Sequence, residues 1–312
     1  MKRNFLQESL FVVLALAIVA LPVSGQLTTS QTNSFAVGDG PEAVAFDGSN
    51  VWVANQFSDT VTKVRASDGA ALGTYAVGNR PVALAFDGSS IWVANYLSDT
   101  ITKLRASTGA TLGTFDAGDG PGGLLFDGTN IWIANRNSNT VKKMSKAGAT
   151  LGTYGVGTRP IALASDGANI WVTNNASNNV TKLRASDGAK LGTFAVGNGP
   201  FGVACDGLNI WVANFFSQTM TKLATDGSVL GTFAVGDGPA GVTYAGSYIW
   251  VANNGSNTVS KVQVSDGALI KNFSVGRGPY GVVYDGANLW VASSSTGQVS
   301  KISPASTTQA VP

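Results

Sequence analysis

The chain has 312 residues, of which 44% are hydrophobic and only 12% charged, and its formal net charge is +2. A charge this small argues against a nucleic-acid-binding protein, because such binding depends on many lysine and arginine contacts with phosphate. The chain contains no histidine and one cysteine. This composition excludes an internal disulfide and any reaction in which imidazole is the base or the metal ligand.

Residues 1–25 predict a signal peptide. Lys2 and Arg3 precede an apolar run over residues 10–21, and small residues lead to a cleavage point after Gly25. This run is shorter than the roughly 20 residues that a bilayer-spanning helix needs, so we expect cleavage and no stable membrane anchor. The mature protein is therefore predicted to be secreted, periplasmic or held at the cell surface. The apolar-poor residues 26–33 and 303–312 predict a flexible N-terminal segment and a disordered C-terminal tail.

The tryptophans mark an internal repeat. The chain has seven of them, spaced 39 or 40 residues apart: Trp52, Trp92, Trp132, Trp171, Trp211, Trp250 and Trp290. A fixed period of this length, with strand-like runs inside each unit, indicates an array of equal supersecondary units.

Each repeat predicts four short strands, which we call a, b, c and d in chain order. In the first repeat, residues 40–55 hold two β-rich runs divided by Asp47-Gly48, and residues 61–65 and 72–78 hold two more. Glycine, aspartate, asparagine and proline separate the runs, as in a four-stranded meander. Proline precedes strand a in every repeat, as at Pro41, and proline is tolerated at the first position of a strand but not in its middle.

The repeats predict an all-β fold, a seven-bladed β-propeller of four-stranded antiparallel blades over residues 34–302. A single four-stranded sheet cannot bury both of its faces, so the units must stack, and a closed ring is the usual solution. The last repeat stops after strand c, whereas residues 34–38 repeat strand d with no strands a to c before them. We therefore expect this N-terminal strand to complete the last blade and close the ring. Small residues in strand a, such as Ala43 and Gly123, suit the crowded axis.

Strand b resembles the tetrapeptide of the YVTN β-propeller repeats. Residues 171–174, Trp-Val-Thr-Asn, match three of its four positions, and residues 52–55 match two. The Val-Gly-x-x-Pro junction and the Asn/Asp-Thr-Val opening of strand c are also similar, and the resemblance covers about Ser34 to Ile302. It implies a propeller that is exported and binds other molecules. Tryptophan replaces the YVTN tyrosine in all seven copies.

A more distant resemblance, in the spacing of Gly-Pro, Asp-Gly and Trp, is to the virginiamycin B lyase group, which is also seven-bladed. That family is similar to metal-assisted lyases that depend on histidine. Because this chain has no histidine, the resemblance implies a shared fold and not a shared reaction.

One face of the predicted propeller varies from repeat to repeat. The d-to-a junctions and b-to-c loops should share this face, which we call the variable face, and the uniform Asp-Gly and Ser-Asp-Gly turns should share the other. Exposed aromatic residues beside arginines are typical of recognition surfaces. The candidate binding residues are Glu42, Phe57, Arg80, Tyr96, Arg136, Arg159, Phe201, Phe215, Phe216, Arg277 and Tyr280. Unconstrained drift of loop residues is the alternative explanation.

Acidic residues suggest a second use of the variable face. Asp39, Glu42 and Asp59 are predicted to lie close to the channel mouth, where a cluster of carboxylates could hold a divalent cation such as Ca²⁺ or act as a base. Solvated loop acids are the commoner explanation. No other cofactor is predicted.

The seven tryptophans and a lysine in strand c of each repeat are interpreted as structural. Each tryptophan would bury on the order of 200 Å² between blades, a gross gain of about 5 kcal/mol. The lysine stems, as at Lys63, should cover apolar blade surface while the ammonium groups reach water.

The sequence contains no catalytic motif, so three hypotheses remain. The first is an exported, monomeric, non-enzymatic module that binds an extracellular or periplasmic glycan, peptide or protein. The second is a lyase-like or hydrolytic enzyme that uses carboxylates of the variable face with a divalent cation. The third is a structural protein of a surface layer.

Overall fold

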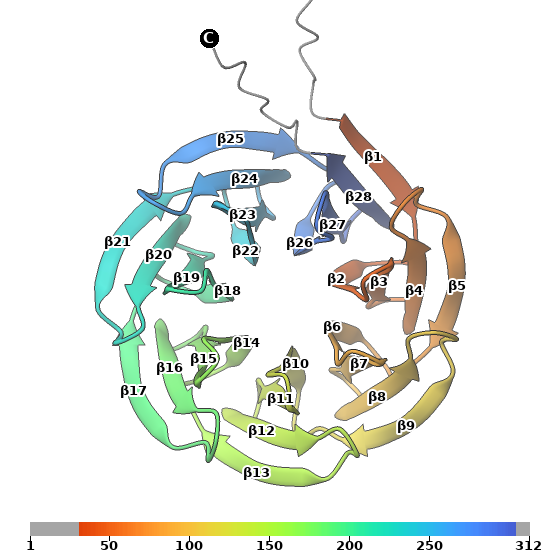
Figure 1. Cartoon of the computed structure of the whole chain (residues 1–312), viewed down its shortest axis with the longest axis horizontal. Helices are drawn as coiled ribbons and strands as arrows, with labels where there is room; N and C mark the ends of the chain where they lie inside the picture. The colour runs from red at the N-terminus through yellow and green to blue at the C-terminus, as the bar shows by residue number, and fades with distance from the viewer. Residues whose placement is uncertain (1–30, 304–312) are drawn as a thin grey trace, which may run out of the picture. The chain divides into compact units, whose positions relative to one another are not determined.

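The computed structural model describes residues 31–303, which form seven four-stranded antiparallel sheets around a central axis (Figure 1). Each sheet is one blade, and strand a of each blade lies innermost while strand d lies at the perimeter (Figure 1). The predicted all-β, seven-bladed propeller is therefore confirmed. Within residues 31–303 no helix is long and apolar enough to cross a membrane.

Blades 1 to 3 are each built from four consecutive strands. Blade 1 holds β2 (Pro41–Phe46), β3 (Asn50–Asn55), β4 (Thr60–Arg65) and β5 (Ala71–Ala76). Blade 2 holds β6 (Pro81–Phe86), β7 (Ser90–Asn95), β8 (Thr100–Arg105) and β9 (Thr111–Asp116). Blade 3 holds β10 (Pro121–Phe126), β11 (Asn130–Asn135), β12 (Thr140–Ser145) and β13 (Thr150–Gly155).

Blades 4 to 6 follow the same plan. Blade 4 holds β14 (Pro160–Ser165), β15 (Asn169–Asn174), β16 (Asn179–Arg184) and β17 (Lys190–Ala195). Blade 5 holds β18 (Pro200–Cys205), β19 (Asn209–Asn214), β20 (Thr219–Ala224) and β21 (Val229–Ala234). Blade 6 holds β22 (Pro239–Ala245), β23 (Tyr248–Asn253), β24 (Thr258–Gln263) and β25 (Leu269–Ser274).

Blade 7 joins the two ends of the described chain. It combines β26 (Pro279–Tyr284), β27 (Leu289–Ser293) and β28 (Gln298–Ser303) with β1 (Gln31–Ala36), and β1 pairs antiparallel with β28. The predicted closure by an N-terminal strand is thus confirmed, although this strand covers residues 31–36 instead of 34–38.

The ends of blade 7 differ from the prediction because main-chain pairing extends further than the apolar pattern. Thr32 pairs with Ile302 and Asn33 with Lys301, so residues 31–33 belong to a strand and not to the flexible segment predicted for 26–33. Ser303 likewise ends β28 and is not part of the tail. Backbone hydrogen bonds between the two strands hold these pairs together, so apolar side chains are not required. The predicted signal peptide, residues 1–25, and the tail after Ser303 lie outside the described residues.

Small residues let the inner strands of neighbouring blades approach. A Cβ atom added to Gly123 would overlap the backbone oxygen of Ile161 in the next blade, and one added to Gly241 would overlap the backbone oxygen of Tyr280. The glycines of strand a therefore set the diameter of the central channel, because larger residues would push the blades outward.

The tryptophans form the core between the blades. Trp52 is fully buried and packs with Val61 of its own blade and with Ile91 and Val93 of the next. The centroid of its ring also lies 5.6 Å from that of Tyr75. Each of the other six blades has a similar pair, with ring centroids 5.4–5.9 Å apart. Aromatic pairs at this distance add to the gain from burial.

An aspartate in the a-to-b turn fixes each indole except one. Trp52 Nε1 donates to Asp47 Oδ2 at 2.8 Å, and the same bond recurs in six of the seven blades. In blade 6 the corresponding position is Ala245, whose side chain has no acceptor for Trp250 Nε1. The Asp-Gly turns, predicted as turn residues alone, therefore have a second role as indole acceptors.

Six of the seven strand c lysines donate a hydrogen bond to a backbone oxygen of the neighbouring blade. Lys63 is buried, its Nζ lies 5.0 Å from the Trp52 ring, and it donates to the backbone oxygen of Ala106 at 2.7 Å. Lys301 closes the ring in the same way by donating to the backbone oxygen of Ala66 at 2.7 Å. The expectation that the ammonium groups reach water was wrong for Lys63 and Lys143, which are buried and donate to a carbonyl oxygen of the next blade.

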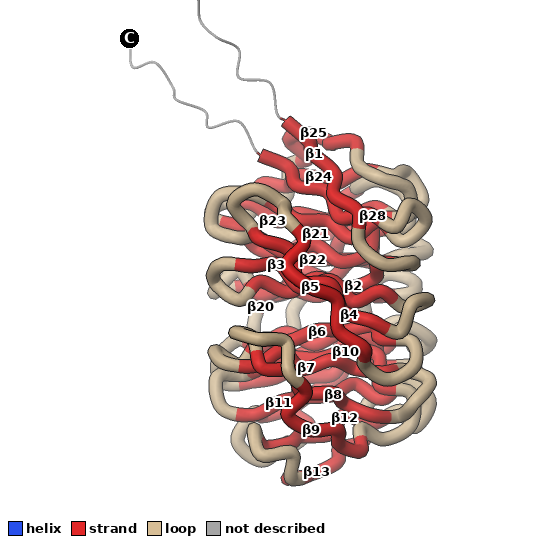
Figure 2. The backbone as a smooth tube through the Cα atoms, turned by 90° about the vertical axis from the view of Figure 1, so that its right-hand side faces the viewer, coloured by secondary structure: helices blue, strands red, loops and turns tan. Residues whose placement is uncertain are grey.

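The two faces of the ring have the predicted composition, and Figure 2 shows the loops gathered on opposite sides of the strands. On one side, the backbone nitrogens of Gln56 and Phe57 in a b-to-c loop donate to the oxygens of Gly40 and Asp39 in a d-to-a junction. On the other side, the nitrogen of Ala66 after strand c donates to the oxygen of Ser49 in an a-to-b turn. The variable face is therefore a hydrogen-bonded layer that presents its side chains from a rigid ring.

Candidate functional site

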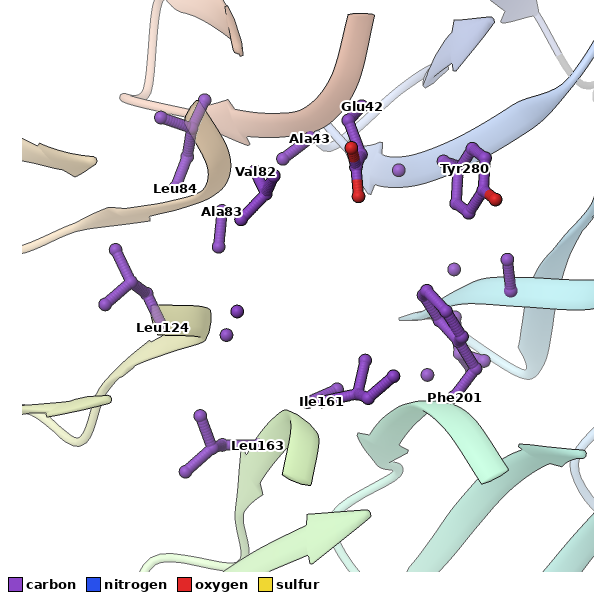
Figure 3. Close-up of a pocket in the computed structure, with 18 of the residues that line it drawn as sticks. Glu42, Ala43, Val82, Ala83, Leu84, Leu124, Ile161, Leu163, Phe201 and Tyr280 are labelled. Atoms are coloured by element: carbon purple, nitrogen blue, oxygen red, sulfur yellow. The ribbon is translucent and has the colours of Figure 1, made fainter. Parts of the chain in front are cut away.

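A cavity of about 190 Å³ occupies the axis, and its mouth opens between the residues that follow the strand a prolines. Figure 3 shows Glu42, Ile161, Phe201 and Tyr280 around this opening, with leucines such as Leu124 lining it. The position directly after the proline holds a different residue in each blade, although the strand that presents it is the same. The cavity is smaller than the roughly 300 Å³ or more of drug-sized ligand pockets, so it suits a small molecule or one group of a larger one.

Arg136 reaches the cavity because its neighbour has no side chain. It comes from the b-to-c loop of blade 3, and its Nη2 donates to the backbone oxygen of Gly122 at 3.2 Å. A Cβ atom at Gly122 would overlap Arg136 Nε. In the other six blades this position after the proline has a side chain, so blade 3 alone leaves room for an arginine to lie inward.

The Arg136 guanidinium is incompletely bonded in this place. Its Nε is buried and has no hydrogen-bond partner. Burial lowers the pKa of Arg136, and the nearby Glu42 opposes this shift only in part. An arginine nonetheless keeps its charge at neutral pH. A buried cation with a free donor is costly unless a partner binds it, so the site is suited to an anionic group.

Tyr96 holds two arginines at the mouth. Its ring centroid lies 5.2 Å from the Arg80 guanidinium carbon and 5.4 Å from that of Arg136, distances typical of cation–π contacts. Tyr96 Oη donates to Asn137 Oδ1 at 3.3 Å, and Arg80 Nε donates to Gln56 Oε1 at 3.3 Å. These contacts orient the arginines without neutralising their charge.

Glu42 is the carboxylate of the mouth, and it has no bonded partner. It is partly buried, and no described residue forms a hydrogen bond or ion pair with it. Burial raises the pKa of Glu42 above its ordinary value, and the attraction of Arg136 and Arg80 offsets only part of that shift. Figure 3 shows its oxygens turned toward the opening. Glu42 and Arg136 are thus opposite charges that share one cavity but do not pair with each other.

Two arginines of the variable face adopt a backbone conformation that favours glycine. Arg80 and Arg159 have φ angles of 56° and 58°. The other five repeats place glycine at this slot, with φ angles of 61–66°: Gly40, Gly120, Gly199, Gly238 and Gly278. A residue with a Cβ atom pays about 1–2 kcal/mol for this region. Strain of this kind is a feature of functional sites.

Aromatic residues gather on the opposite part of the mouth. The ring of Phe201 lies 5.8 Å from that of Tyr280 and 6.0 Å from that of Phe215, which in turn lies 5.4 Å from Phe216. Burial, followed by the charge of Glu42, raises the pKa of Tyr280, so the phenol stays neutral at physiological pH. The mouth therefore joins a charged half, from blades 1 to 3, to an aromatic half, from blades 5 and 7.

The remaining predicted residues lie around the mouth and not in it. Phe57 is 69% exposed and its ring covers Gly40. Phe216 is equally exposed over Gly199. Arg159 and Arg277 are exposed. These side chains form an outer zone that a larger ligand could contact.

The predicted acidic cluster does not assemble. Asp59 Oδ1 accepts a hydrogen bond from the backbone nitrogen of Arg80 at 2.7 Å, so this aspartate stabilises a junction. Asp39 is exposed, and Glu42 lies in the mouth. Within residues 31–303 no three cysteine or acidic side chains converge as metal ligands would.

Sequence reasoning missed Gly122, Gln56 and Asn137. Gly122 admits Arg136, Gln56 binds Arg80, and Asn137 accepts from Tyr96. Asn137 is itself held by Asp119 Oδ1 at 2.8 Å. A signal for Gly122 was present, since it is the only glycine directly after the strand a proline in seven repeats. The other two gave none.

Solved structures share this fold. Virginiamycin B lyase from Staphylococcus aureus is similar with a TM-score of 0.78 at 17% identity, over 88% of this chain and 100% of that chain. A streptogramin B lyase structure gives 0.76 at 17%, over 88% and 97%. Hydrazine synthase of Kuenenia stuttgartiensis gives 0.78 at 20%, over 85% and 96%. No family model matches the chain, and no curated protein matches it. Similarity at these identities shows the fold alone.

Proposed function

We propose that this protein is an exported, monomeric, non-enzymatic binding module that recognises a glycan, peptide or protein with its variable face. The observation that supports this most is the channel mouth, where Glu42 and Arg136 keep unused bonding capacity beside an aromatic cluster. The ring does not need these groups, because other blades close without them. Rigid scaffolds with irregular loops commonly use such loops for recognition.

The composition of the mouth favours binding over catalysis. General acid–base catalysis commonly uses one group as base and a second as acid, and Glu42 is the only carboxylate among the described residues that line the cavity. One virginiamycin B lyase structure similar to this chain is described as a catalytically inactive histidine-to-alanine variant with quinupristin. This chain has no histidine. The fold likeness therefore does not favour a lyase.

A pull-down from an extract of the producing cells tests the proposal. The test variant changes Tyr96, Arg136, Phe215 and Phe216 to serine. The matched control changes four exposed side chains of the opposite face to serine: Arg65, Arg105, Arg184 and Leu208. We expect the test variant to lose a partner that the parent and the control both retain. Identical partners for all three proteins would contradict the proposal, and assembly into large particles by light scattering would favour a surface layer instead.

A further inference from the structure

The charges at the channel mouth define the kind of small ligand that fits it. The Arg136 side chain lines the cavity, and its buried Nε has no partner, so the guanidinium is incompletely bonded. Glu42 also lines the cavity, and no described residue bonds to its carboxylate. Arg136 and Glu42 come from blades 3 and 1 and do not form an ion pair with each other. A ligand with only one charge would satisfy one of them and leave the other partly buried and unpaired, which is costly. A ligand with both an anionic and a cationic group satisfies both.

The apolar part of the cavity sets the second requirement. Phe201 and Tyr280 present their rings to the opening, and Val82, Leu124 and Ile161 complete the lining (Figure 3). An apolar cavity of about 150 Å³ already accepts benzene, and this one has about 190 Å³. There is room for one aromatic or branched side chain but not for an oligosaccharide or a folded segment.

We propose that the channel mouth binds a zwitterion with an apolar side chain, such as a free aromatic α-amino acid or a short peptide with both ends charged. The carboxylate of the ligand pairs with Arg136, with Arg80 as a second cation nearby. The ammonium group pairs with Glu42. The side chain of the ligand lies against Phe201 and Tyr280. This inference rests on the proposed binding function and specifies the ligand class for the inner part of the same face.

The strained arginines are consistent with this assignment. Arg80 and Arg159 add positive charge on the side of the mouth where Arg136 lies. Burial is the main cause of the lowered pKa of Arg136, and repulsion from Arg159 and Arg80 lowers it further. A bound carboxylate would relieve that repulsion. Phe57, Phe216 and Arg277 do not line the cavity, so the inner site and the outer zone can be tested separately.

Calorimetric titration with four probes tests the proposal on the full mature chain. The probes are L-phenylalanine, 3-phenylpropanoate, which lacks the ammonium group, phenethylamine, which lacks the carboxylate, and the dipeptide Gly-L-Phe. We expect L-phenylalanine or the dipeptide to bind at least about tenfold more tightly than either singly charged analogue, since a charge left unpaired costs on the order of 1.4 kcal/mol or more. The tighter of the two zwitterions identifies an amino acid or a peptide as the ligand.

Substitutions of single residues test which protein side chain binds each charged group of the ligand. Glu42→Gln should weaken L-phenylalanine about tenfold and leave 3-phenylpropanoate unchanged or tighter. Arg136→Gln should weaken binding of the three probes that carry a carboxylate and leave the affinity for phenethylamine unchanged or tighter. Arg105→Gln, an exposed arginine of the opposite face, should change every affinity less than twofold. Circular dichroism checks that each variant is folded.

Three results would overturn the assignment. Equal affinities for the zwitterions and the singly charged probes would show that the two charges do not act together, and so would a Glu42→Gln variant that binds L-phenylalanine like the parent. Absence of binding by all four probes at millimolar concentration would also reject it. The proposed binding function would survive that last result if the serine variant of the variable face still lost its partner in the pull-down.

Discussion

The hydrogen bond between each indole and its aspartate can be measured by comparing two tryptophans of the same ring. Trp132 is fully buried and donates to Asp127 Oδ2 at 2.6 Å, whereas Trp250 has Ala245 at the corresponding position. Both rings pack between blades against a partner ring, Tyr154 at 5.9 Å and Phe273 at 5.4 Å. Changing each tryptophan to phenylalanine removes similar packing, but only Trp132→Phe also removes a bond to a carboxylate.

The expected difference follows from the strength of that bond. A hydrogen bond to a charged group contributes about 1.5–3 kcal/mol, so Trp132→Phe should lower the free energy of unfolding by this amount more than Trp250→Phe does. A propeller of this size loses about 2–4 °C of Tm for each kcal/mol lost from the free energy of unfolding. We therefore expect the Tm of Trp132→Phe to fall by about 3–12 °C more than that of Trp250→Phe. Differential scanning calorimetry of the two variants and the parent measures it. Equal losses of Tm would refute the reasoning, because the aspartates would then serve the turns alone.

Four further predictions follow from single positions. Trp132→Ala should cost about 3–5 kcal/mol by denaturant unfolding, as large cavities between packed elements do, and an unchanged midpoint would contradict a core role. Arg159→Gly should raise stability by about 0.5–1 kcal/mol, because relief of the left-handed strain exceeds the entropy cost of glycine; a loss of stability would show that no strain is stored there. Gly122→Val should displace Arg136 and weaken L-phenylalanine at least about tenfold with little change in melting, and an unaltered affinity would place Arg136 outside the site. Glu42→Gln should stabilise the protein at pH 7.

The sign of the last effect follows from the raised pKa of Glu42. A carboxyl group whose pKa is higher in the folded state contributes stability while it is protonated and loses it as pH rises from the ordinary value through the raised one. The gain from Glu42→Gln should therefore shrink as pH falls toward 4.5, the ordinary pKa. A gain that is independent of pH would exclude titration of Glu42 as its cause.

The turn aspartates have the opposite dependence. Burial raises the pKa of Asp47, but hydrogen bonds from Trp52, Asn50 and Ser49 outweigh burial and leave it below the ordinary value of 3.8. Asp87, Asp166, Asp206 and Asp285 behave in the same way. Stability that depends on these carboxylates is present above the ordinary pKa and is lost as pH falls below 3.8. A Tm that stays constant from pH 5 to pH 2.5 would contradict this.

The sequence predicted the fold well because each blade repeats the same local signals. The tryptophan spacing, the proline before strand a and the Asp-Gly turn all mark strand boundaries. Each boundary is determined by residues within a few positions of it. The N-terminal strand was harder, because residues 31–33 are held by pairing with β28, which lies more than 260 residues away. Composition alone made them look flexible.

The candidate site was predicted only in outline. The sequence could place Glu42 and Arg136 on one face, since each lies next to a residue, proline or asparagine, that marks the end of a strand. It could not show that Gly122 leaves space for Arg136, that Asp59 is occupied by the backbone of Arg80, or that the lysine ammonium of one blade reaches a carbonyl of the next. Each of these contacts joins loops or blades that are far apart in sequence, and their distances follow from ring closure.

Some residues of the variable face differ from those at the same positions of other repeats. Titration with L-phenylalanine of a variant that removes these differences tests most directly whether they serve recognition. Four residues of the variable face are replaced by residues that other repeats place at the same positions: Glu42→Ala, Arg80→Gly, Arg136→Asn and Arg159→Gly. We expect this variant to melt at the parent temperature or a few degrees above it, and no longer to bind L-phenylalanine. Binding equal to that of the parent in a folded variant would contradict it.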